Sequence, residues 1–189
     1  SISWDLQEDA KGRIWITLHG KGLSRFEPRT GKFTNFSFSN GRFKPSWTND
    51  AEQLIIKENG NVLLICQRGI VEIDTNDEVS VLTDLSTEKT LVDPGTFRFG
   101  VLYENRWLWL TTATQILCFD LQSKTWETTS NNPRKLKLLD RKWQAHGAQF
   151  HGNTLWFSTY FKPQYSPNRF LYSFSLKTNM LDSVAIAPN

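Results

Sequence analysis

The chain has 189 residues, of which 39% are hydrophobic and 13% aromatic, and this composition excludes a disordered tail because it supplies ample apolar surface for a packed core. The formal net charge is only +3 and the charges are scattered along the chain, so the sequence gives little support to a nucleic-acid partner. Eight Trp and thirteen Phe against one Met favour β-structure over an adaptable helical bundle.

The cysteines and the hydrophobic runs say little about compartment. Cys66 and Cys118 occupy different strand positions in their repeats, which indicates buried free thiols rather than a disulfide framework or a CxxC site. No apolar run approaches the roughly 18 residues that a membrane-spanning helix needs, and no charged-then-apolar leader opens the chain. Because the chain begins without Met, we expect an excerpt or a processed piece of a longer protein, and membrane contact only through parts of that protein outside this stretch.

A fourfold internal repeat organises the chain, and its first signpost is the segment Gly12 to Thr17, GRIWIT. The echoes of this segment are GNVLLI at 60–65, NRWLWL at 105–110 and GNTLWF at 152–157. If Trp15, Leu64, Trp109 and Trp156 are taken as equivalents, the spacings are 49, 45 and 47 residues. We expect the three Trp side chains to be buried between neighbouring sheets, each contributing roughly 2 to 3 kcal/mol.

A second signpost follows each first one and ends in an acid in three of the four repeats. Its copies are LSRFE at 23–27, IVEID at 70–74, ILCFD at 116–120 and LYSFS at 171–175. A β-prone segment precedes each first signpost, at 2–7, 53–57, 97–103 and 144–150, and another follows each polar turn, at 33–38, 79–82, 125–129 and 180–186. Each repeat therefore predicts four short strands in about 45 to 50 residues, the size of one propeller blade.

The predicted fold is all-β, with four four-stranded antiparallel β-propeller blades in a single propeller segment, 1–189. The predicted blades are 1–40, 50–83, 95–130 and 143–188. No strand is lent across the chain ends to close a ring, so an arc of a larger ring is favoured over a closed four-bladed propeller. An arc exposes two apolar blade faces, and we expect these to drive self-association or contact with other propeller blades.

Blade four has a longer middle loop than the other blades. The loop runs from Tyr160 to Arg169, and an insertion of this kind usually lies on a surface rim and carries binding function.

Blade one, read as EDAKGRIWITLHGKGLSRFEPRTGKF from Glu8 to Phe33, resembles the two-component regulator propeller repeat. Blades two to four fit that pattern only loosely. In that family many such blades form the extracytoplasmic sensor part of membrane histidine kinases, including hybrid kinases that respond to carbohydrates. The resemblance implies a sensor segment and not an enzyme, in a periplasmic or extracellular place, with any histidine kinase elsewhere in the parent protein. Those sensors also carry many more blades, a membrane helix and a kinase, all of which this chain lacks.

Binding is expected on the propeller face where the loops between second and third strands meet the loops between blades. The first set of loops is 18–22, 66–69, 112–115 and 160–169, and the second is 40–50, 83–95 and 131–142. The candidate ligand-binding residues are His19, Lys21, Arg42, Lys44, Trp47, Gln67, Arg68, Lys162, Tyr165 and Arg169. Aromatic faces beside Arg, Lys and Gln suit a small-molecule or oligosaccharide ligand, because rings stack on sugar CH groups while donors meet hydroxyls. The alternative is that these are ordinary solvated loop residues.

We expect no metal site, no cofactor and no catalytic residues. His146 and His151 lie five residues apart on an extended segment, which places them roughly 16 Å apart on opposite faces. His151 occupies a hairpin-turn position. Glu8-Asp9 and its echoes lack the dense ligand spacing of a calcium loop and are better explained as turns. The basic segment Arg134 to Lys142 is predicted to be a solvated connection between blades.

Three functions remain open at this point. The first is ligand sensing or partner binding in a two-component receptor, with carbohydrate as a possible ligand. The second is a propeller enzyme of the streptogramin lyase type, because GNTLWFST at 152–159 follows that family's blade rhythm. The third is a protein-interaction module of the kelch or WD kind, because FDLQSKTW at 119–126 is kelch-like.

Overall fold

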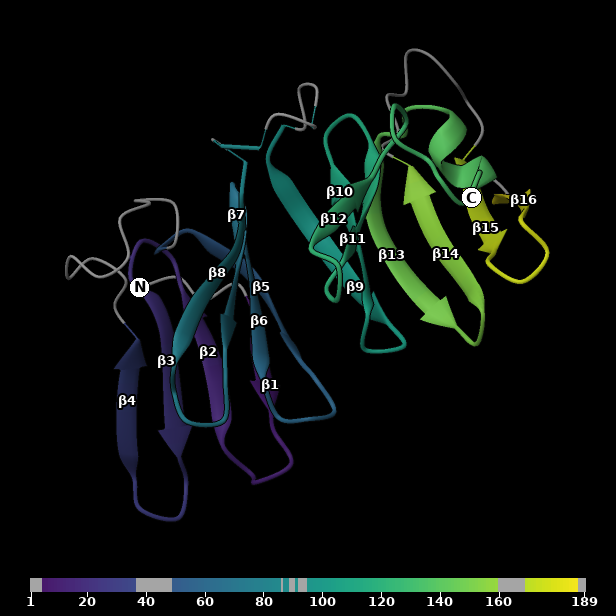
Figure 1. The fold of residues 1–189 in the computed structure, drawn as a ribbon. Helices are drawn as coiled ribbons and strands as arrows, with labels where there is room; N and C mark the ends of the chain where they lie inside the picture. Colours follow the sequence, from purple (N-terminus) through teal and green to yellow (C-terminus); the bar gives the residue numbers. More distant parts are fainter. Residues whose placement is uncertain are drawn as a thin grey trace. The chain divides into compact units, whose positions relative to one another are not determined.

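Four four-stranded antiparallel sheets make up the protein, as seen in a computed structural model (Figure 1). The structure describes residues 5–36, 49–85, 87–88, 91, 95–159 and 169–186, without the side chains of His146 and Arg169. The chain divides into two compact units, Ser1–Lys89 and Thr90–Asn189, with two sheets in each. The predicted all-β fold of four propeller blades is confirmed. Among the described residues no helix is both long and apolar enough to cross a bilayer.

Unit 1 holds blades one and two, and each blade pairs its strands in chain order. Blade one consists of β1 (Leu6–Glu8), β2 (Ile14–Leu18), β3 (Gly22–Glu27) and β4 (Lys32–Phe36). Blade two consists of β5 (Ala51–Ile56), β6 (Val62–Cys66), β7 (Gly69–Ile73) and β8 (Val79–Asp84).

Unit 2 holds blades three and four with the same sequential pairing. Blade three consists of β9 (Phe97–Tyr103), β10 (Trp107–Thr112), β11 (Ile116–Asp120) and β12 (Thr125–Glu127). Blade four consists of β13 (Ala145–His151), β14 (Thr154–Thr159), β15 (Arg169–Ser175) and β16 (Met180–Ile186). A four-residue 3-10 helix, Lys137–Asp140, lies in the connection between them.

The glycine or asparagine that begins each first signpost has a backbone reason. Gly12, Gly60, Asn105 and Gly152 have φ values of 74°, 84°, 51° and 55° in the turn between first and second strands. Only glycine adopts this left-handed conformation without a steric cost, and asparagine tolerates it better than most residues. The repeat in the sequence is therefore a repeat of turn geometry.

The strand register corrects one predicted equivalence. In each blade, one pair joins the start of the second strand to the residue before the end of the second signpost. These pairs are Ile14↔Phe26, Val62↔Ile73, Leu108↔Phe119 and Leu155↔Phe174. The counterpart of Trp15 in blade two is therefore Leu63 and not Leu64. Because β-strand side chains alternate, this one-residue difference moves the equivalent side chain to the other face of the blade.

The register defines two faces on each blade, which we call the Trp face (Trp15 and its equivalents) and the aliphatic face (Ile14 and its equivalents). In unit 1 the Trp face of blade one packs on the aliphatic face of blade two, where Trp15, Leu23 and Phe36 share a core with Val62 and Leu64. Trp15 is only 1% exposed there.

Polar contacts also join blades one and two. The Gln7 side chain donates to the Leu54 carbonyl at 2.7 Å, and the Leu54 N–H donates to the Asp5 carboxylate at 2.9 Å. The guanidinium of Arg25 lies 5.1 Å from the Trp15 ring and binds the carboxylate of Asp77 in blade two. These polar contacts therefore hold blade one in a defined position on blade two.

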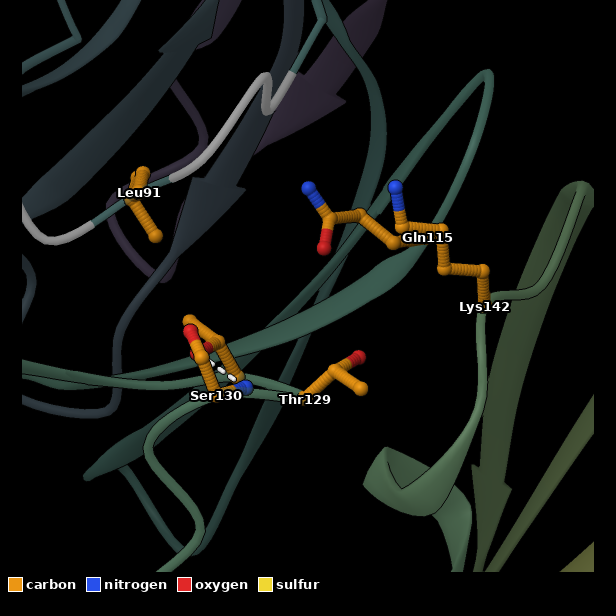
Figure 2. A pocket seen from close by; sticks show the side chains of 6 residues that line it. Leu91, Gln115, Thr129, Ser130 and Lys142 are labelled. Carbon is orange, nitrogen blue, oxygen red and sulfur yellow. Dashed lines mark hydrogen bonds between the residues drawn. The ribbon is translucent and has the colours of Figure 1, made fainter.

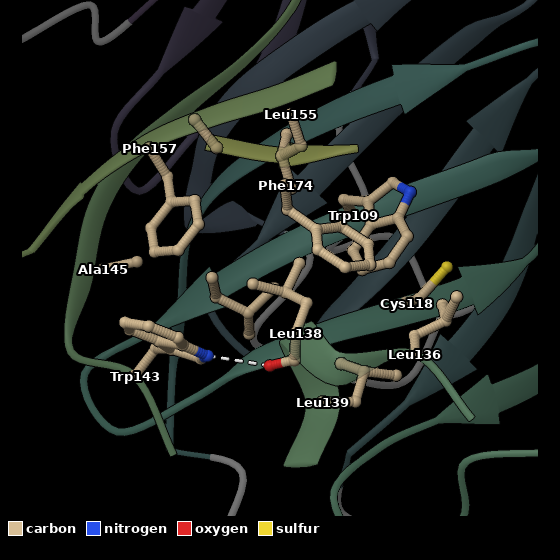
Figure 3. Packing of buried hydrophobic residues seen from close by; sticks show 12 residues of the cluster. Trp109, Cys118, Leu136, Leu138, Leu139, Trp143, Ala145, Leu155, Phe157 and Phe174 are labelled. Carbon is tan, nitrogen blue, oxygen red and sulfur yellow. Dashed lines mark hydrogen bonds between the residues drawn. The ribbon is translucent and has the colours of Figure 1, made fainter. Parts of the chain in front are cut away.

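Unit 2 repeats this arrangement with an added layer (Figure 3). Trp109 and Cys118 of blade three share a core with Leu155, Phe157 and Phe174 of blade four. The connection between the blades adds Leu136, Leu138, Leu139 and Trp143 to the same core, all of them buried. The Trp143 indole donates to the Leu138 carbonyl at 2.7 Å and closes the connection on itself.

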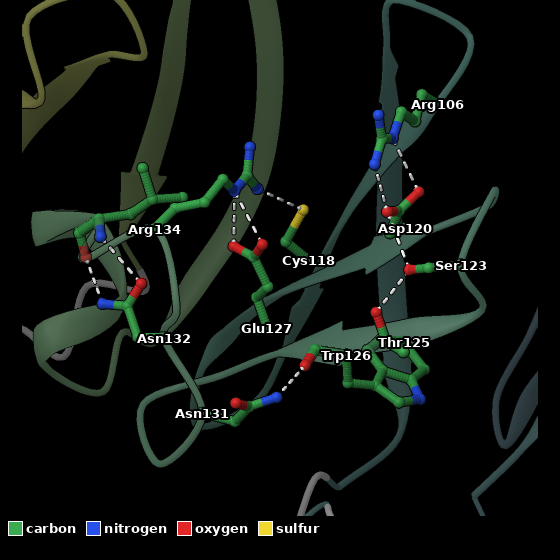
Figure 4. Close-up of polar contacts among 11 residues, drawn as sticks. Arg106, Cys118, Asp120, Ser123, Thr125, Trp126, Glu127, Asn131, Asn132 and Arg134 are labelled. Atoms are coloured by element: carbon green, nitrogen blue, oxygen red, sulfur yellow. Dashed lines mark hydrogen bonds and ion pairs between the residues drawn. The ribbon is translucent and has the colours of Figure 1, made fainter.

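The prediction of a solvated connection is wrong for half of the basic segment. Its three leucines are buried, and Arg134 places both carboxylate oxygens of Glu127 within 2.8 Å of its Nε (Figure 4). The same guanidinium lies 3.7 Å from the centre of the Trp107 ring. Lys135, Lys137 and the residues from Asp140 to Lys142 are exposed as predicted.

The prediction that all three Trp side chains are buried holds for Trp15 and Trp109, each 1% exposed, but is wrong for Trp156, which is half-buried. Trp156 lies on the Trp face of blade four, and no other sheet of unit 2 packs on that face.

The acid that ends the second signpost organises the turn after it. Asp74 accepts the N–H groups of Asn76 and Glu78 at 2.8 Å. Asp120 accepts the Gln122 N–H and the paired donors of Arg106 (Figure 4). The Arg106 hydrogen bonds hold the pKa of Asp120 well below its usual range, although burial opposes them.

Blade four lacks this acid, and there the Ser175 hydroxyl accepts the Thr178 N–H at 3.2 Å. A smaller acceptor therefore does the same work in that turn.

Candidate functional site

The ten predicted binding residues fall into three groups. Arg42, Lys44, Trp47, Lys162 and Tyr165 lie outside the described residues, and Arg169 is placed only as the first residue of β15. Four are described in unit 1, and they are His19, Lys21, Gln67 and Arg68. None of these four residues lines the pocket of unit 2 that is described below.

The four described candidates lie in the predicted loops. His19, Lys21 and Arg68 are exposed, at the turns from β2 to β3 and from β6 to β7. Gln67 is half-buried and its amide donates to the Glu52 carboxylate at 2.7 Å, so it is already engaged within blade two. Their role in binding stays a prediction.

Unit 2 contains a pocket of about 270 Å³ in its loops (Figure 2). The residues that line it are Leu91, Gln115, Thr128, Thr129, Ser130 and Lys142. Gln115, Leu91 and Lys142 come from three of the loop ranges predicted to form the binding face, although none of the three was selected. In the view of Figure 2, Gln115 lies between Leu91 and Lys142.

Hydrogen bonds fix the wall that follows β12. The Thr128 hydroxyl accepts the N–H groups of Ser130 and Asn131 at 3.2 and 3.1 Å, and it lies 3.1 Å from the Ser130 hydroxyl. The Asn131 side chain donates to the Trp126 carbonyl at 2.6 Å. This wall therefore keeps its shape without a ligand, and the exposed Thr129 and Ser130 side chains are presented on a fixed turn.

A second turn fixes Gln115. The Thr112 hydroxyl accepts the N–H groups of Thr114 and Gln115 at 3.2 and 3.1 Å, and the Thr112 N–H donates to the Gln115 carbonyl at 2.9 Å. Gln115 is 5% exposed. The backbone at this residue is held by its own turn, so the amide is carried on a rigid base.

The packed connection brings Lys142 to the pocket. Its neighbour Trp143 is 5% exposed and makes an edge-on contact with the Phe157 ring, with the ring centres 5.0 Å apart. The Arg141 guanidinium lies 3.9 Å from the centre of the Trp143 ring. Lys142 itself is exposed. The buried Trp143 indole therefore fixes the backbone next to Lys142, while the Lys142 side chain is exposed.

The lining suits a small ligand that is rich in hydroxyl groups. Hydroxyl and amide side chains both donate and accept hydrogen bonds, and Lys142 adds a donor that favours a carboxylate. The volume lies just below the range of about 300–1,000 Å³ that is usual for ligand pockets, so a single sugar ring suits it better than a chain of rings. Among the described lining residues none is aromatic, so these residues do not provide the stacking predicted for a sugar site.

Sequence reasoning missed this pocket because its polar wall has no distinctive chemistry. The run TTSNN at 128–132 reads as an ordinary polar turn, and the choice of candidates favoured charged and aromatic residues. The only available signal was that loop ranges from separate parts of the repeat were expected to converge.

The described residues contain no group of three or more His, Cys, Asp or Glu side chains that could hold a metal ion. Asp9, considered above as part of a calcium loop, instead closes its own turn by accepting the N–H groups of Lys11 and Arg13 and the indole N–H of Trp15 at 2.8 Å. His151 is the last residue of β13, paired with Thr154, so the turn consists of Gly152 and Asn153 and not of His151 as predicted.

The register of β13 shifts between Ala145 and Gly147, so regular strand alternation does not place His146 and His151 on opposite faces as predicted. The distance along the strand still separates the two residues.

Both predicted buried thiols are confirmed. Cys66 and Cys118 are free and 0% exposed, and burial raises the pKa of each far above its ordinary value.

Comparison with known proteins gives structural likenesses only. No family model and no curated protein sequence matches the chain. Among solved structures, the extracellular domain of BT3049, a candidate hybrid two-component system from B. thetaiotaomicron, has a TM-score of 0.67 and 16% identity, over 99% of this chain and 22% of that one. The extracellular domain of BT4673, a second such system from the same organism, has a TM-score of 0.59 and 13% identity, over 82% of this chain and 19% of that one.

A gluconolactonase from Xanthomonas campestris, XC5397, is also similar, with a TM-score of 0.58 and 12% identity over 99% of this chain and 62% of that enzyme. The present chain thus spans about a fifth of the length of the two sensor domains. These likenesses confirm the fold that the resemblance of blade one implies, that of the propeller sensor domains.

Proposed function

We propose that this chain is a ligand-binding segment of the extracytoplasmic propeller sensor of a two-component receptor, and that it binds without catalysis. The observation that carries the proposal is the likeness of the chain to the extracellular domains of BT3049 and BT4673. The repeat pattern of blade one supports the same class independently, because it comes from the sequence and not from the fold. The proposal includes a periplasmic or extracellular location.

The pocket of unit 2 is the proposed ligand site, and a single sugar ring or a sugar acid is the proposed ligand class. Its support is chemical, because Gln115, Thr129 and Ser130 offer hydrogen bonds to hydroxyl groups while Lys142 offers a charge to a carboxylate. Both walls are prearranged by their own hydrogen bonds, which lowers the cost of ordering them on binding.

Isothermal titration calorimetry against neutral monosaccharides and the matching uronic acids tests this site. We expect Thr129→Val and Ser130→Ala to weaken both ligand classes. Lys142→Met should weaken only the acids, by about fivefold, because an exposed charge pair contributes about 1 kcal/mol at most.

Lys137→Met is the matched control, since this lysine is exposed on the same connection but does not line the pocket. Equal affinity of all variants, or no saturable binding by any sugar tested, would contradict the pocket assignment. In that case the loops that carry Trp47, Arg68 and Tyr165 become the next site to test, with substitutions at those three residues.

The enzyme alternative keeps one supporting observation, the likeness to a gluconolactonase. Turnover of lactone substrates that disappears on adding a chelator and returns with divalent metal would favour it over the sensor proposal. The interaction-module alternative has no specific support in the structure, and capture of a defined protein partner from the native compartment would revive it.

A further inference from the structure

The connection between blades three and four, residues 128–144, supplies two separate parts of the pocket lining in unit 2. Thr128, Thr129 and Ser130 lie at its start and Lys142 lies near its end, so four of the six described lining residues belong to this one segment. The middle of the connection packs into the core of unit 2. The spacing between the two parts of the lining therefore depends on where that middle is held.

Asn179 of blade four holds the middle of the connection. This residue lies on the turn between β15 and β16, and its side-chain oxygen accepts the Lys137 N–H at 2.9 Å. Its side-chain amide group donates to the Lys135 carbonyl at 2.8 Å. Leu176 of the same turn packs against the core that contains the leucines of the connection. Polar and apolar contacts therefore join this turn to a segment that is more than 40 residues away along the chain.

The turn position of Asn179 recurs in blades one and three. Gly31, Lys124 and Asn179 each precede the last strand of their blade, and their φ values are 68°, 57° and 55°. Asparagine tolerates this left-handed conformation, but glycine adopts it without steric cost. The backbone therefore does not require an asparagine, whereas the two hydrogen bonds to the connection do require its amide.

Hydrogen bonds within the connection link its middle to the first part of the lining. The Asn132 side chain accepts the Leu136 N–H at 2.8 Å and donates to the Leu136 carbonyl at 2.9 Å. The preceding residue, Asn131, donates its N–H to the Thr128 hydroxyl at 3.1 Å and closes the turn that lines the pocket. A shift of the middle of the connection is therefore passed on to this turn.

The second part of the lining is linked to the middle in the same way. The Trp143 indole donates to the Leu138 carbonyl at 2.7 Å, and Leu138 is the neighbour of Lys137 in the 3-10 helix. Trp143 directly follows Lys142. The residue that Asn179 binds and the lysine of the pocket therefore belong to one closed loop.

We propose that Asn179 is a positioning residue for the pocket of unit 2, because it holds the connection at its middle and thereby sets the spacing between Thr128–Ser130 and Lys142. A sugar acid that meets the hydroxyl groups of one part and the ammonium group of the other depends on this spacing. The ligand is that of the proposed function, on which this role therefore rests, whereas the shape of the pocket can be followed without any ligand.

Amide hydrogen exchange of the chain without ligand tests the role of Asn179. Asn179→Gly is the informative variant, because glycine keeps the left-handed turn and removes both side-chain contacts. We expect exchange about tenfold faster at Lys137, Ser130 and Asn131, since the loss of two hydrogen bonds changes a local opening equilibrium by about that factor. Asn179→Asp should have an intermediate effect, because it keeps an acceptor for the Lys137 N–H and loses the donor.

Lys124→Gly is the matched control. It makes the same change at the equivalent left-handed turn position of blade three, where the side chain is exposed. Exchange at Lys137, Ser130 and Asn131 should be the same as in the wild type. Circular dichroism and the melting temperature show whether each variant is folded.

Calorimetry with a uronic acid then measures the effect on binding. Asn179→Gly should weaken the affinity by about threefold to tenfold, because the site is fully competent only while the connection is held. Lys124→Gly should bind as the wild type does.

Unchanged exchange at Ser130 and Asn131 in a folded Asn179→Gly chain would overturn the positioning role, even if Lys137 exchanges faster, because the contact would then affect only its own surroundings. Equal effects of Asn179→Gly and Lys124→Gly would overturn it too, since turn stability would explain both. The same holds for unchanged affinity in Asn179→Gly for an acid that the wild type binds. If the wild type binds no sugar, the proposed ligand class fails, while the exchange rates still test the role of Asn179.

Discussion

Equivalent tryptophans in blades one and three differ in their polar surroundings. The Trp15 indole donates to Asp9 at 2.8 Å, whereas the Trp109 indole nitrogen is buried with no hydrogen-bond partner among the described residues. Blade three has a tighter turn, Glu104-Asn105, in place of the turn that carries Asp9, so no carboxylate reaches the second indole. An unpaired buried N–H costs free energy that a paired one does not.

We therefore expect Trp15→Phe to lower the free energy of unfolding by about 1–3 kcal/mol more than Trp109→Phe does, since only the first removes a hydrogen bond to a carboxylate. Urea unfolding followed by circular dichroism measures both changes. Equal losses would show that packing alone determines the cost at these positions.

Two carboxyl groups link stability to acid pH. Burial of Asp9 raises its pKa, but the hydrogen bonds from Trp15, Arg13 and Lys11 outweigh it and lower the pKa below the ordinary value. For Asp120 the Arg106 hydrogen bonds are the largest influence and also lower the pKa. A depressed folded-state pKa contributes stability above the unfolded pKa of about 3.9, and this stability is lost as pH falls through the folded value.

We expect Asp9→Asn and Asp120→Asn each to be less stable than the wild type at pH 7 and to lose less stability between pH 5 and pH 2. Melting temperatures measured across that pH range test this. Asp182→Asn is the control, because Asp182 is exposed on β16. Its melting temperature should fall between pH 5 and pH 2 by as much as that of the wild type.

The two thiols should be silent in the native protein. Burial raises the pKa of both Cys66 and Cys118, and only the thiolate reacts rapidly with disulfide reagents. We expect Ellman's reagent to titrate two thiols in urea and none within minutes under native conditions. Rapid reaction of one thiol in the native state would show that its strand opens locally.

At the scale of elements, the connection between blades three and four contributes to the core of unit 2 as a strand does. Leu138 is 0% exposed among residues from both blades. We expect Leu138→Ala to lower the free energy of unfolding by about 2–5 kcal/mol, since it leaves a cavity, whereas Lys137→Ala should change it by about 0.5 kcal/mol or less. Chemical denaturation distinguishes the two, and a small effect at Leu138 would mean that the connection is not part of the cooperative core.

The strands and hairpins were predictable because each follows from a local rule. Glycine or asparagine is needed at the left-handed turn, and the second signpost ends in a group that caps the next turn. The register in blade two was not predictable, because Leu63 and Leu64 have the same side chain and only the strand pairing shows which of them is equivalent to Trp15. The burial of the connection between blades three and four was not predicted, because its three leucines stand among charged residues and form no extended strand or helix pattern.

At the scale of the whole molecule, the pocket could be predicted only as a region. The repeat indicated which loop ranges converge, but the residues that line a hollow depend on how turns with no strong signature are packed. The half-exposure of Trp156 was missed for a related reason, since the sequence shows that a residue is equivalent to Trp15 but not whether another sheet covers it.

Ligand binding should affect one unit selectively, because the six described residues that line the pocket belong to Thr90–Asn189. With a ligand identified by calorimetry, we expect amide hydrogen exchange to slow around Gln115 and across 128–130, while β2 and β6 of unit 1 are unchanged. Protection confined to unit 1 would instead favour the loops around His19 and Arg68.

Within the described parts of the chain no sheet contains strands from two repeats, because each strand pairs only with strands of its own blade. A gene duplication or deletion of one whole repeat therefore leaves each remaining backbone ladder intact and alters only the side-chain surfaces at the join. Proteins that descend from such a chain can therefore gain or lose a whole blade in one genetic step. A new pair of neighbouring blades is stable only where a Trp face packs on an aliphatic face.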